Sequence, residues 1–211
     1  MTECPYDPRD PCRPCQGAIY RDIIATIVAT PATEPPEHVE VSEWTFPYAI
    51  AMSQECDLYQ DHSGRESLHS VDSPSIEEDS RASHDKLLLN VLMCPGYVAS
   101  DFRGGKHLAR VGRVMSSYTS SQWRSINSNQ HPRFHYLAAW GEFQVTEMVI
   151  DFKHFFTLPT EQLRGAYAGP DHYIARLRCP YREDLSQRFA AYLARIGLPA
   201  PHHRIALAGG S

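Results

Sequence analysis

The stretch from Ser53 to Asp57 gathers a hydroxyl, a thiol and two carboxylates directly after a short apolar run. That run, Pro47–Met52, has the length and composition of a buried strand, and loops at strand ends commonly carry functional side chains. Cys56 would need a depressed pKa to act as a nucleophile, yet the acidic side chains of Glu55 and Asp57 disfavour a thiolate. We therefore expect Cys56 to pack as a small apolar residue and Asp57 to cap a turn or a helix start.

A second group of side chains suited to chemistry is His131-Pro-Arg133-Phe-His135. His131 and His135, with Arg133 and the Ser53 hydroxyl, could cleave RNA by general acid–base catalysis without a metal. Aromatic and guanidinium groups together are also typical of surfaces that stack on single-stranded nucleic acid. Pro132 prevents a helix here, so the two histidines are not a helical metal-binding pair.

The first residues are rich in cysteine and proline, a composition that excludes a helix or a central strand. Cys12-x-x-Cys15 is half of a zinc knuckle, and Cys4 could be a third ligand. The sequence has no second Cys-x-x-Cys, so a fourth ligand would have to be another cysteine or a histidine. Reduced thiols on an irregular arm without metal are the alternative. The sequence predicts no other cofactor, since it has no Walker, dinucleotide-binding or His-Glu-x-x-His pattern.

Charge is divided unevenly along the chain. Residues 1–100 carry 6 Lys/Arg and 17 Asp/Glu, whereas residues 101–211 carry 14 Lys/Arg and 8 Asp/Glu. Either the two halves neutralise each other in the fold, or the second half forms a basic face for RNA or for an acidic partner protein. The cations that we assign to that face are Lys106, Arg110, Arg113, Arg124 and Arg133.

The length of 211 residues indicates one domain that carries an insertion. The segment 59–85 is acidic, Ser-rich and poor in large apolar groups, so burial cannot offset the entropy of ordering it. A helix is predicted near the end of the chain because Leu185 and Phe189 begin an apolar stripe at helical spacing. The expected parts are an arm at 1–16, a β core at 17–58 and 86–178, a mobile acidic insertion at 59–85, and a C-terminal helix at 180–196.

No run approaches the roughly 18 consecutive apolar residues that a membrane helix needs. The Cys- and Pro-rich start is not a signal peptide. We therefore expect a cytoplasmic protein that makes no membrane contact.

A Gly-Ala-Ile strand at residue 17, followed by Pro47-x-Ala-Ile-Ala-Met-Ser53 and a polar turn, resembles the MazF/PemK group of small β-barrel toxins. The resemblance covers residues 17–58 and, by strand order, 87–152. It implies an SH3-like antiparallel barrel within an α+β fold, metal-independent RNA cleavage, and neutralisation by an antitoxin segment. Ser53 matches the hydroxyl residue after the family's second core strand, but Phe46 stands where the family has an arginine before the strand proline.

That departure favours the barrel without its full chemistry. The leading expectation is an accessory or interaction protein of a prokaryotic toxin or defence system, which binds a partner protein or RNA. The alternative is a metal-independent MazF-like endoribonuclease that uses Ser53, His131 and His135.

Overall fold

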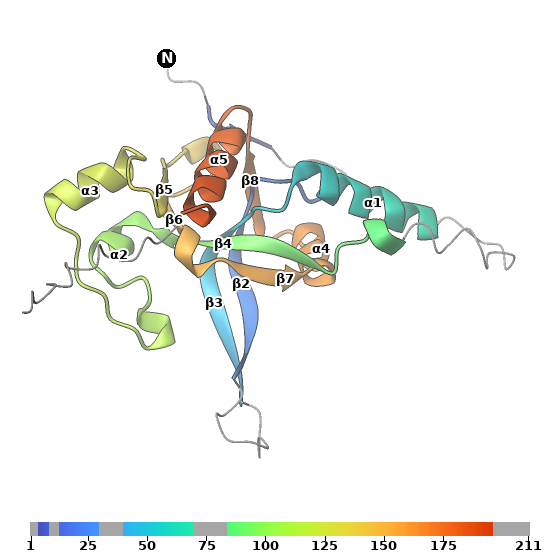
Figure 1. The fold of residues 1–211 in the computed structure, drawn as a ribbon, viewed down its shortest axis with the longest axis horizontal. Coiled ribbons are helices and arrows are strands. Elements are labelled where there is room, and N and C mark those ends of the chain that lie inside the picture. The colour runs from blue at the N-terminus through green and yellow to red at the C-terminus, as the bar shows by residue number, and fades with distance from the viewer. Residues whose placement is uncertain (1–3, 9–12, 30–39, 70–83, 196–211) are drawn as a thin grey trace, which may run out of the picture.

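A computed structural model describes residues 4–8, 13–29, 40–69 and 84–195, to which all structural statements refer. One antiparallel sheet forms its centre (Figure 1). Its strands are β1 (Tyr6–Asp7), β2 (Ala18–Ala29), β3 (Glu40–Ala51), β4 (Asn90–Val98), β5 (Phe134–Leu137), β6 (Met148–Asp151), β7 (Phe156–Pro159) and β8 (Tyr173–Leu177). Their order is β1-β8-β2-β3-β4-β6-β5, and β7 pairs with the first half of β4.

Several helices surround this sheet. The α-helices are α1 (Glu55–His69), α2 (Ala99–Arg103), α3 (Ser120–Asn127), α4 (Thr160–Ala168) and α5 (Tyr181–Leu193), and the short 3-10 turns are η2 (Ala109–Val111), η3 (Gly141–Phe143) and η4 (Phe152–His154). None of the helices in the described residues is long and apolar enough to cross a membrane.

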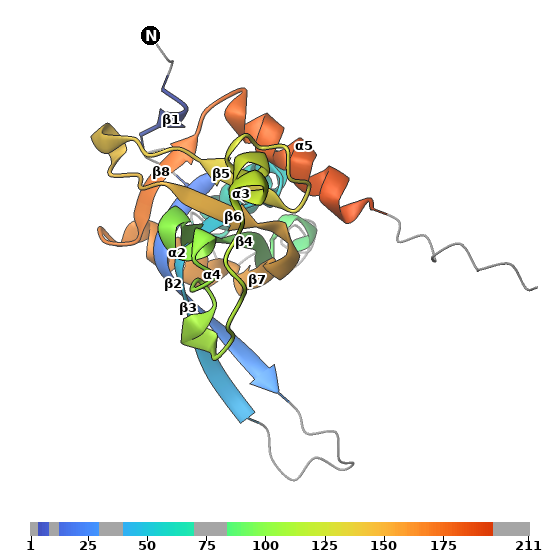
Figure 2. The same ribbon diagram turned by 90° about the vertical axis from the view of Figure 1, so that its left-hand side faces the viewer.

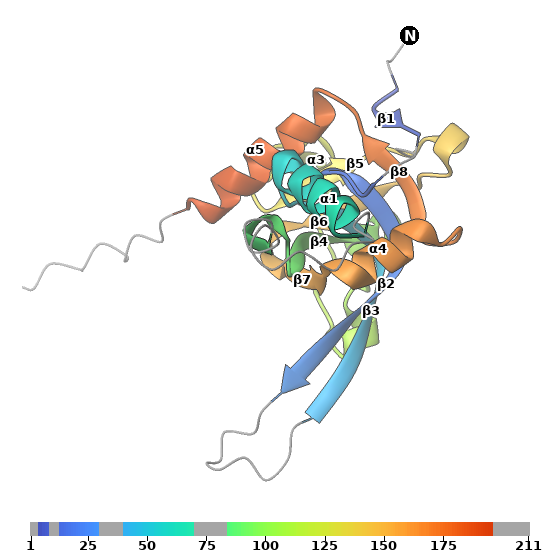
Figure 3. The same cartoon turned by 90° about the vertical axis from the view of Figure 1, so that its right-hand side faces the viewer.

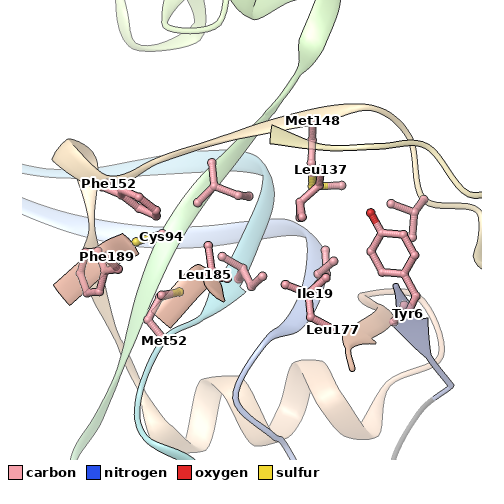
Figure 4. Close-up of a cluster of buried hydrophobic side chains, with 14 residues drawn as sticks. Tyr6, Ile19, Met52, Cys94, Leu137, Met148, Phe152, Leu177, Leu185 and Phe189 are labelled. Carbon is pink, nitrogen blue, oxygen red and sulfur yellow. The ribbon is translucent and has the colours of Figure 1, made fainter. Parts of the chain in front are cut away.

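The sheet curls into a half-barrel whose two edges meet. The hydroxyl of Tyr6 donates a hydrogen bond to the carbonyl oxygen of Ala138, 2.7 Å away. Ala138 directly follows β5, so this bond joins the β5 edge of the sheet to the β1 edge. Apolar side chains fill the inside of the curl, among them Ile19 from β2, Phe152 after β6 and Leu185 from α5 (Figure 4).

The prediction of a buried strand at Pro47–Met52 is confirmed. Ala49, Ile50 and Ala51 are fully buried on β3, and Met52 is 5% exposed. β2 pairs with β3 along almost all of its length, and the outer half of this hairpin extends away from the body of the protein (Figures 2 and 3). The hairpin therefore has a buried base in the barrel and an outer half that can form one wall of a surface site.

The C-terminal helix is also confirmed, as α5, but its apolar stripe is shorter than predicted. Leu185 and Phe189 are buried, whereas Leu193 is 51% exposed. The N-terminal arm differs from the irregular segment that was predicted, because Tyr6 and Asp7 pair with β8 at the edge of the sheet. An edge position is where a proline-rich segment can join a sheet, since the missing N–H groups face away from it.

The predicted mobile insertion at 59–85 is wrong for its first part. Residues up to 69 continue α1, and residues 70–83 lie outside the described part of the chain. Asp61 is 4% exposed and accepts hydrogen bonds from the Arg65 side chain at 2.9 Å and the Leu88 backbone N–H at 2.8 Å. A largely polar helix is thus anchored by a buried carboxylate. Cys56 is exposed in its first turn, not packed as predicted.

The coarse prediction is therefore confirmed: the fold combines a curled antiparallel half-barrel with several helices.

Candidate functional site

A pocket of about 360 Å³ opens beside the middle of the β2–β3 hairpin. Four separate segments build it: the middle of β3, the β4–α2 junction, the loop after α2, and the segment around η4. Its lining residues are Trp44, Thr45, Phe46, Pro47, Tyr97, Val98, Asp101, Lys106, His107, Leu108, Arg110, Val111, Arg113, Lys153, His154, Phe155 and Phe156.

Positive charge surrounds this pocket. Lys106, Arg110, Arg113 and Lys153 are all exposed, and none of them has an ion-pair partner within the described ranges. Asp101 is the one carboxylate among the lining residues. Other arginines of the protein are paired with carboxylates, in Arg13–Glu55, Arg65–Asp61 and Arg182–Glu183. The pocket therefore concentrates cations whose counter-ion the described chain does not supply, an arrangement that favours an anionic ligand.

Aromatic side chains form the walls between these cations. Phe46 and Phe156 stack with ring centroids 4.6 Å apart, and the Arg113 guanidinium lies 5.9 Å from the centre of the Trp44 ring. Phe155, also in the lining, is 44% exposed. Phe46 is buried, whereas Phe155 and the partly exposed Trp44 are open to a ligand. Exposed aromatic rings beside guanidinium groups are the combination on which unpaired bases stack.

The loop that carries Lys106, Arg110 and Arg113 is fixed at its base. Gly105 adopts φ +73°, and a Cβ at this position would clash with the carbonyl oxygen of Met115. The Met115 N–H donates to the Gly105 carbonyl at 3.2 Å, which ties the two ends of the loop together. A glycine is required here because the left-handed conformation and the close backbone approach both exclude a side chain.

A buried carboxylate organises the floor next to the pocket. Asp151, at the end of β6, is fully buried and accepts two hydrogen bonds from Arg133, at 2.8 and 2.6 Å. His154 Nδ1 lies 2.8 Å from Asp151 Oδ2, the oxygen that Arg133 also contacts, although the angle is not that of a hydrogen bond. Burial alone would raise the pKa of Asp151, but the hydrogen bonds from Arg133 and the close approach of His154 outweigh it and lower the pKa to about 2.

This carboxylate fixes how His154 is presented. The His154 ring lines the pocket, and its side chain is 27% exposed. Because Nδ1 faces Asp151, Nε2 is the nitrogen available to a ligand. A carboxylate that holds one imidazole nitrogen selects the tautomer and orientation in which the other can accept a proton. His154 is therefore the imidazole of the pocket that lies beside a carboxylate.

His107 differs from His154 because it is held by apolar packing. Its ring centroid lies 4.3 Å from that of Phe102 and 5.0 Å from that of Tyr97. Burial lowers the pKa of His107 to about 4, so the ring is neutral near pH 7. Both ring nitrogens, and the hydroxyl of Tyr97, are covered and find no hydrogen-bond partner among the described residues.

The structure places the five predicted cations in three different settings. Lys106, Arg110 and Arg113 line the pocket together. Arg124 is exposed on α3 and is not among the residues lining the pocket. Arg133 is not a free surface cation, because its guanidinium is committed to Asp151 and lies over the Phe134 ring.

The predicted catalytic set is not brought together. The Ser53 hydroxyl accepts a hydrogen bond from the Leu92 N–H at 2.9 Å, at the start of β4. His135 lies opposite Ile150 of β6, and Ile150 lies opposite Gly96 of β4. Gly96 is four residues, or about 13 Å, along β4 from Leu92, the residue that Ser53 contacts. Ser53 and His135 are therefore too far apart to share a proton.

The two predicted histidines serve the packing around α5 and β5. His131 stacks on Phe134 with centroids 4.6 Å apart, and its Nδ1 accepts a hydrogen bond from the Arg133 N–H at 3.2 Å. His135 is 4% exposed, and burial together with the nearby Arg188 lowers its pKa to about 3. Neither of them lines the pocket.

The predicted zinc ligands are only partly described. The Cys4 thiol donates to the Tyr6 carbonyl at 3.4 Å, Cys15 is 1% exposed, and Cys12 lies outside the described residues. No group of three or more His, Cys, Asp or Glu side chains suited to a metal occurs in the described ranges. The zinc site stays a prediction.

The sequence-based assignment missed His154 and His107 and did not place Lys153 among the cations of the basic face. The run Asp151-Phe-Lys153-His154 after an apolar strand was the available signal, since a strand end is a common place for functional side chains. His107, in a glycine-punctuated basic loop, had no comparable signal.

Comparison of the chain with models of known protein families, with curated proteins and with solved structures finds no match to any of them.

Proposed function

We propose that this protein binds single-stranded RNA in the pocket beside the hairpin, as an accessory protein of a prokaryotic toxin or defence system built on a MazF-like barrel. One observation carries the proposal: Lys106, Arg110, Arg113 and Lys153 surround an aromatic-walled pocket without ion-pair partners among the described residues. The cations match backbone phosphates, and the rings match unpaired bases.

The size of the pocket supports a single strand over larger ligands. Its volume of about 360 Å³ is near the lower end of ligand pockets, which span roughly 300–1,000 Å³. A partner helix, about 10 Å across, would not enter it. Stacking of one base on an aromatic side chain contributes about 1–3 kcal/mol, so a single inserted nucleotide is enough for measurable binding.

The test is the salt dependence of affinity for a labelled single-stranded oligoribonucleotide, measured by fluorescence anisotropy. Contacts from four cations predict a slope of log K against log salt of about −3, at roughly 0.7 per phosphate contact. The double variant Arg110→Ala/Arg113→Ala is expected to bind more weakly and to have a slope smaller in magnitude by about 1.4.

Lys86→Ala is the matched control, because Lys86 is an exposed cation that does not line the pocket. It should leave both affinity and slope unchanged. The proposed site would be overturned by an unchanged salt slope in the double variant, or by a loss of affinity in Lys86→Ala as large as that in the double variant.

Metal-independent cleavage of RNA is a second candidate, and the Asp151–His154 contact is the observation that favours it. In that reaction His154 Nε2 takes the proton of a ribose 2′-hydroxyl, whose oxygen attacks the adjacent phosphorus. The bond from phosphorus to the 5′-oxygen breaks, and the leaving oxygen takes a proton from water. The products are a 2′,3′-cyclic phosphate and a free 5′-hydroxyl.

If the protein cleaves RNA, fragments form in EDTA and the rate falls by about 10²–10⁴-fold in His154→Ala, as expected for loss of a general base. RNA affinity should stay near that of the unmodified protein, which distinguishes the catalytic role of His154 from the RNA binding of the cations. His84→Ala, at an exposed histidine outside the pocket, is the control. Intact RNA, or full-rate cleavage by His154→Ala, would exclude this candidate.

A further inference from the structure

We propose that the pocket takes one nucleotide with its base inward, and that Tyr97 and His107 determine which base is accepted. The inference rests on the proposed function and adds to it a base-specific subsite, distinct from the cations that hold phosphate.

The first observation is the hydroxyl of Tyr97. Tyr97 lines the pocket, is 2% exposed, and its hydroxyl finds no partner in the described part of the chain. Buried hydroxyl groups in folded proteins nearly always have a hydrogen-bond partner, because leaving one unpaired costs about 1–3 kcal/mol. The described chain supplies no such partner, so a polar group of a ligand that enters the pocket would remove this cost.

The second observation is His107, whose ring contacts that of Tyr97 and whose two ring nitrogens also lack hydrogen-bond partners among the described residues. Its neutral ring offers one donor and one acceptor. A neutral donor and acceptor beside a phenol hydroxyl are complementary to the edge of a nucleobase. They are poorly suited to a phosphate, which only accepts hydrogen bonds near neutral pH.

The exposed cations fix the orientation of the nucleotide. The Asp151 carboxylate and the Arg133 guanidinium form a paired, mutually neutralising set, and both act on Tyr97 and His107 with opposite signs. The exposed cations Lys106 and Arg113 lie toward solvent. A phosphate is therefore attracted to these unpaired cations at the rim, and the uncharged base points inward toward Tyr97 and His107.

The aromatic walls complete the subsite. Trp44 and Phe155 line the pocket, and Phe155 keeps 44% of its surface exposed. Every base can stack on such rings, so stacking contributes affinity but no base specificity. Specificity comes from hydrogen bonds, because a base whose edge does not match would leave the polar atoms of Tyr97 and His107 without partners.

The experiment uses the full chain and measures how well AMP, GMP, CMP and UMP displace a labelled oligoribonucleotide, with ribose 5-phosphate and inorganic phosphate as the phosphate-only probes. We expect one nucleotide to compete at least about tenfold better than the other three, and both phosphate-only probes to compete worst of all. Tyr97→Phe and His107→Phe should each reduce this preference several-fold while the salt slope stays the same. Arg113→Ala should weaken all four nucleotides equally.

Equal competition by all four nucleotides, or by ribose 5-phosphate, would overturn the subsite, as would an unchanged preference in both phenylalanine variants. If the oligoribonucleotide binds but no mononucleotide displaces it, the subsite is wrong and RNA binding stands. If the oligoribonucleotide does not bind at all, both proposals fail.

Discussion

Replacing Arg133 by methionine is expected to lower the free energy of unfolding by about 3–5 kcal/mol, because the substitution leaves the Asp151 carboxylate buried without its main cation. Asp151 is fully buried and Arg133 contacts both of its oxygens. Only the Lys153 backbone N–H and the His154 ring would then remain beside the carboxylate. Urea denaturation at pH 7, followed by circular dichroism, measures the change.

The double variant Arg133→Met/Asp151→Asn should recover part of this loss, since it removes the unpaired charge as well as its partner. The effect also depends on pH. A folded-state pKa of about 2 for Asp151 lies below its ordinary value, so the stability that it contributes is present above about pH 4 and is lost as the pH falls toward 2. The difference between the parent protein and Arg133→Met should therefore shrink in acid. A loss below 1 kcal/mol at pH 7 would contradict this account of the pair.

The second large effect is expected in acid and comes from His135. Burial and Arg188 lower its pKa to about 3, whereas the unfolded chain titrates near 6.5. Between these two values the unfolded state binds a proton that the folded state does not, so stability falls as the pH drops below about 6.5. At about 1.4 kcal/mol per pKa unit the loss is on the order of 4 kcal/mol by pH 3.

His135→Phe should flatten this dependence, because a ring of similar shape cannot take up the proton. Asp184 Oδ2 lies 3.9 Å from the His135 ring but is 59% exposed, so it offsets little of the burial. The measurement is urea denaturation at a series of pH values from 7 to 4, with His84→Gln as an exposed control. Parallel curves for the parent protein and His135→Phe would show that another group governs acid stability.

The parts of the fold that the sequence predicts are those fixed by local pattern. Pro47–Met52 is an apolar run between a proline and a polar turn, and it is buried on β3. Leu185 and Phe189 at helical spacing face the core, as expected for α5. The helix α1 was missed because its stability depends on a contact between distant residues: Asp61 binds the Leu88 N–H, 27 positions along the chain.

In the site, too, contacts between residues distant in the sequence could not be predicted from local pattern. Lys106, Arg110 and Arg113 were identified by their charge alone, but nothing local shows that the Arg133 guanidinium is already occupied. That depends on β5 pairing with β6, which sets Phe134 opposite Asp151 and brings Arg133 within reach of its carboxylate. His154 follows β6 and lines the pocket, whereas His131 and His135 do not.

Photo-cross-linking of a single-stranded oligoribonucleotide that carries 4-thiouridine, with the modified peptides mapped by mass spectrometry, tests the central claim most directly. The account predicts cross-links within the pocket walls, at Trp44, Tyr97 or Phe155, and their loss in Arg110→Ala/Arg113→Ala. Cross-links confined to α1, or to Arg124 and its neighbours on α3, with none in the pocket, would contradict it.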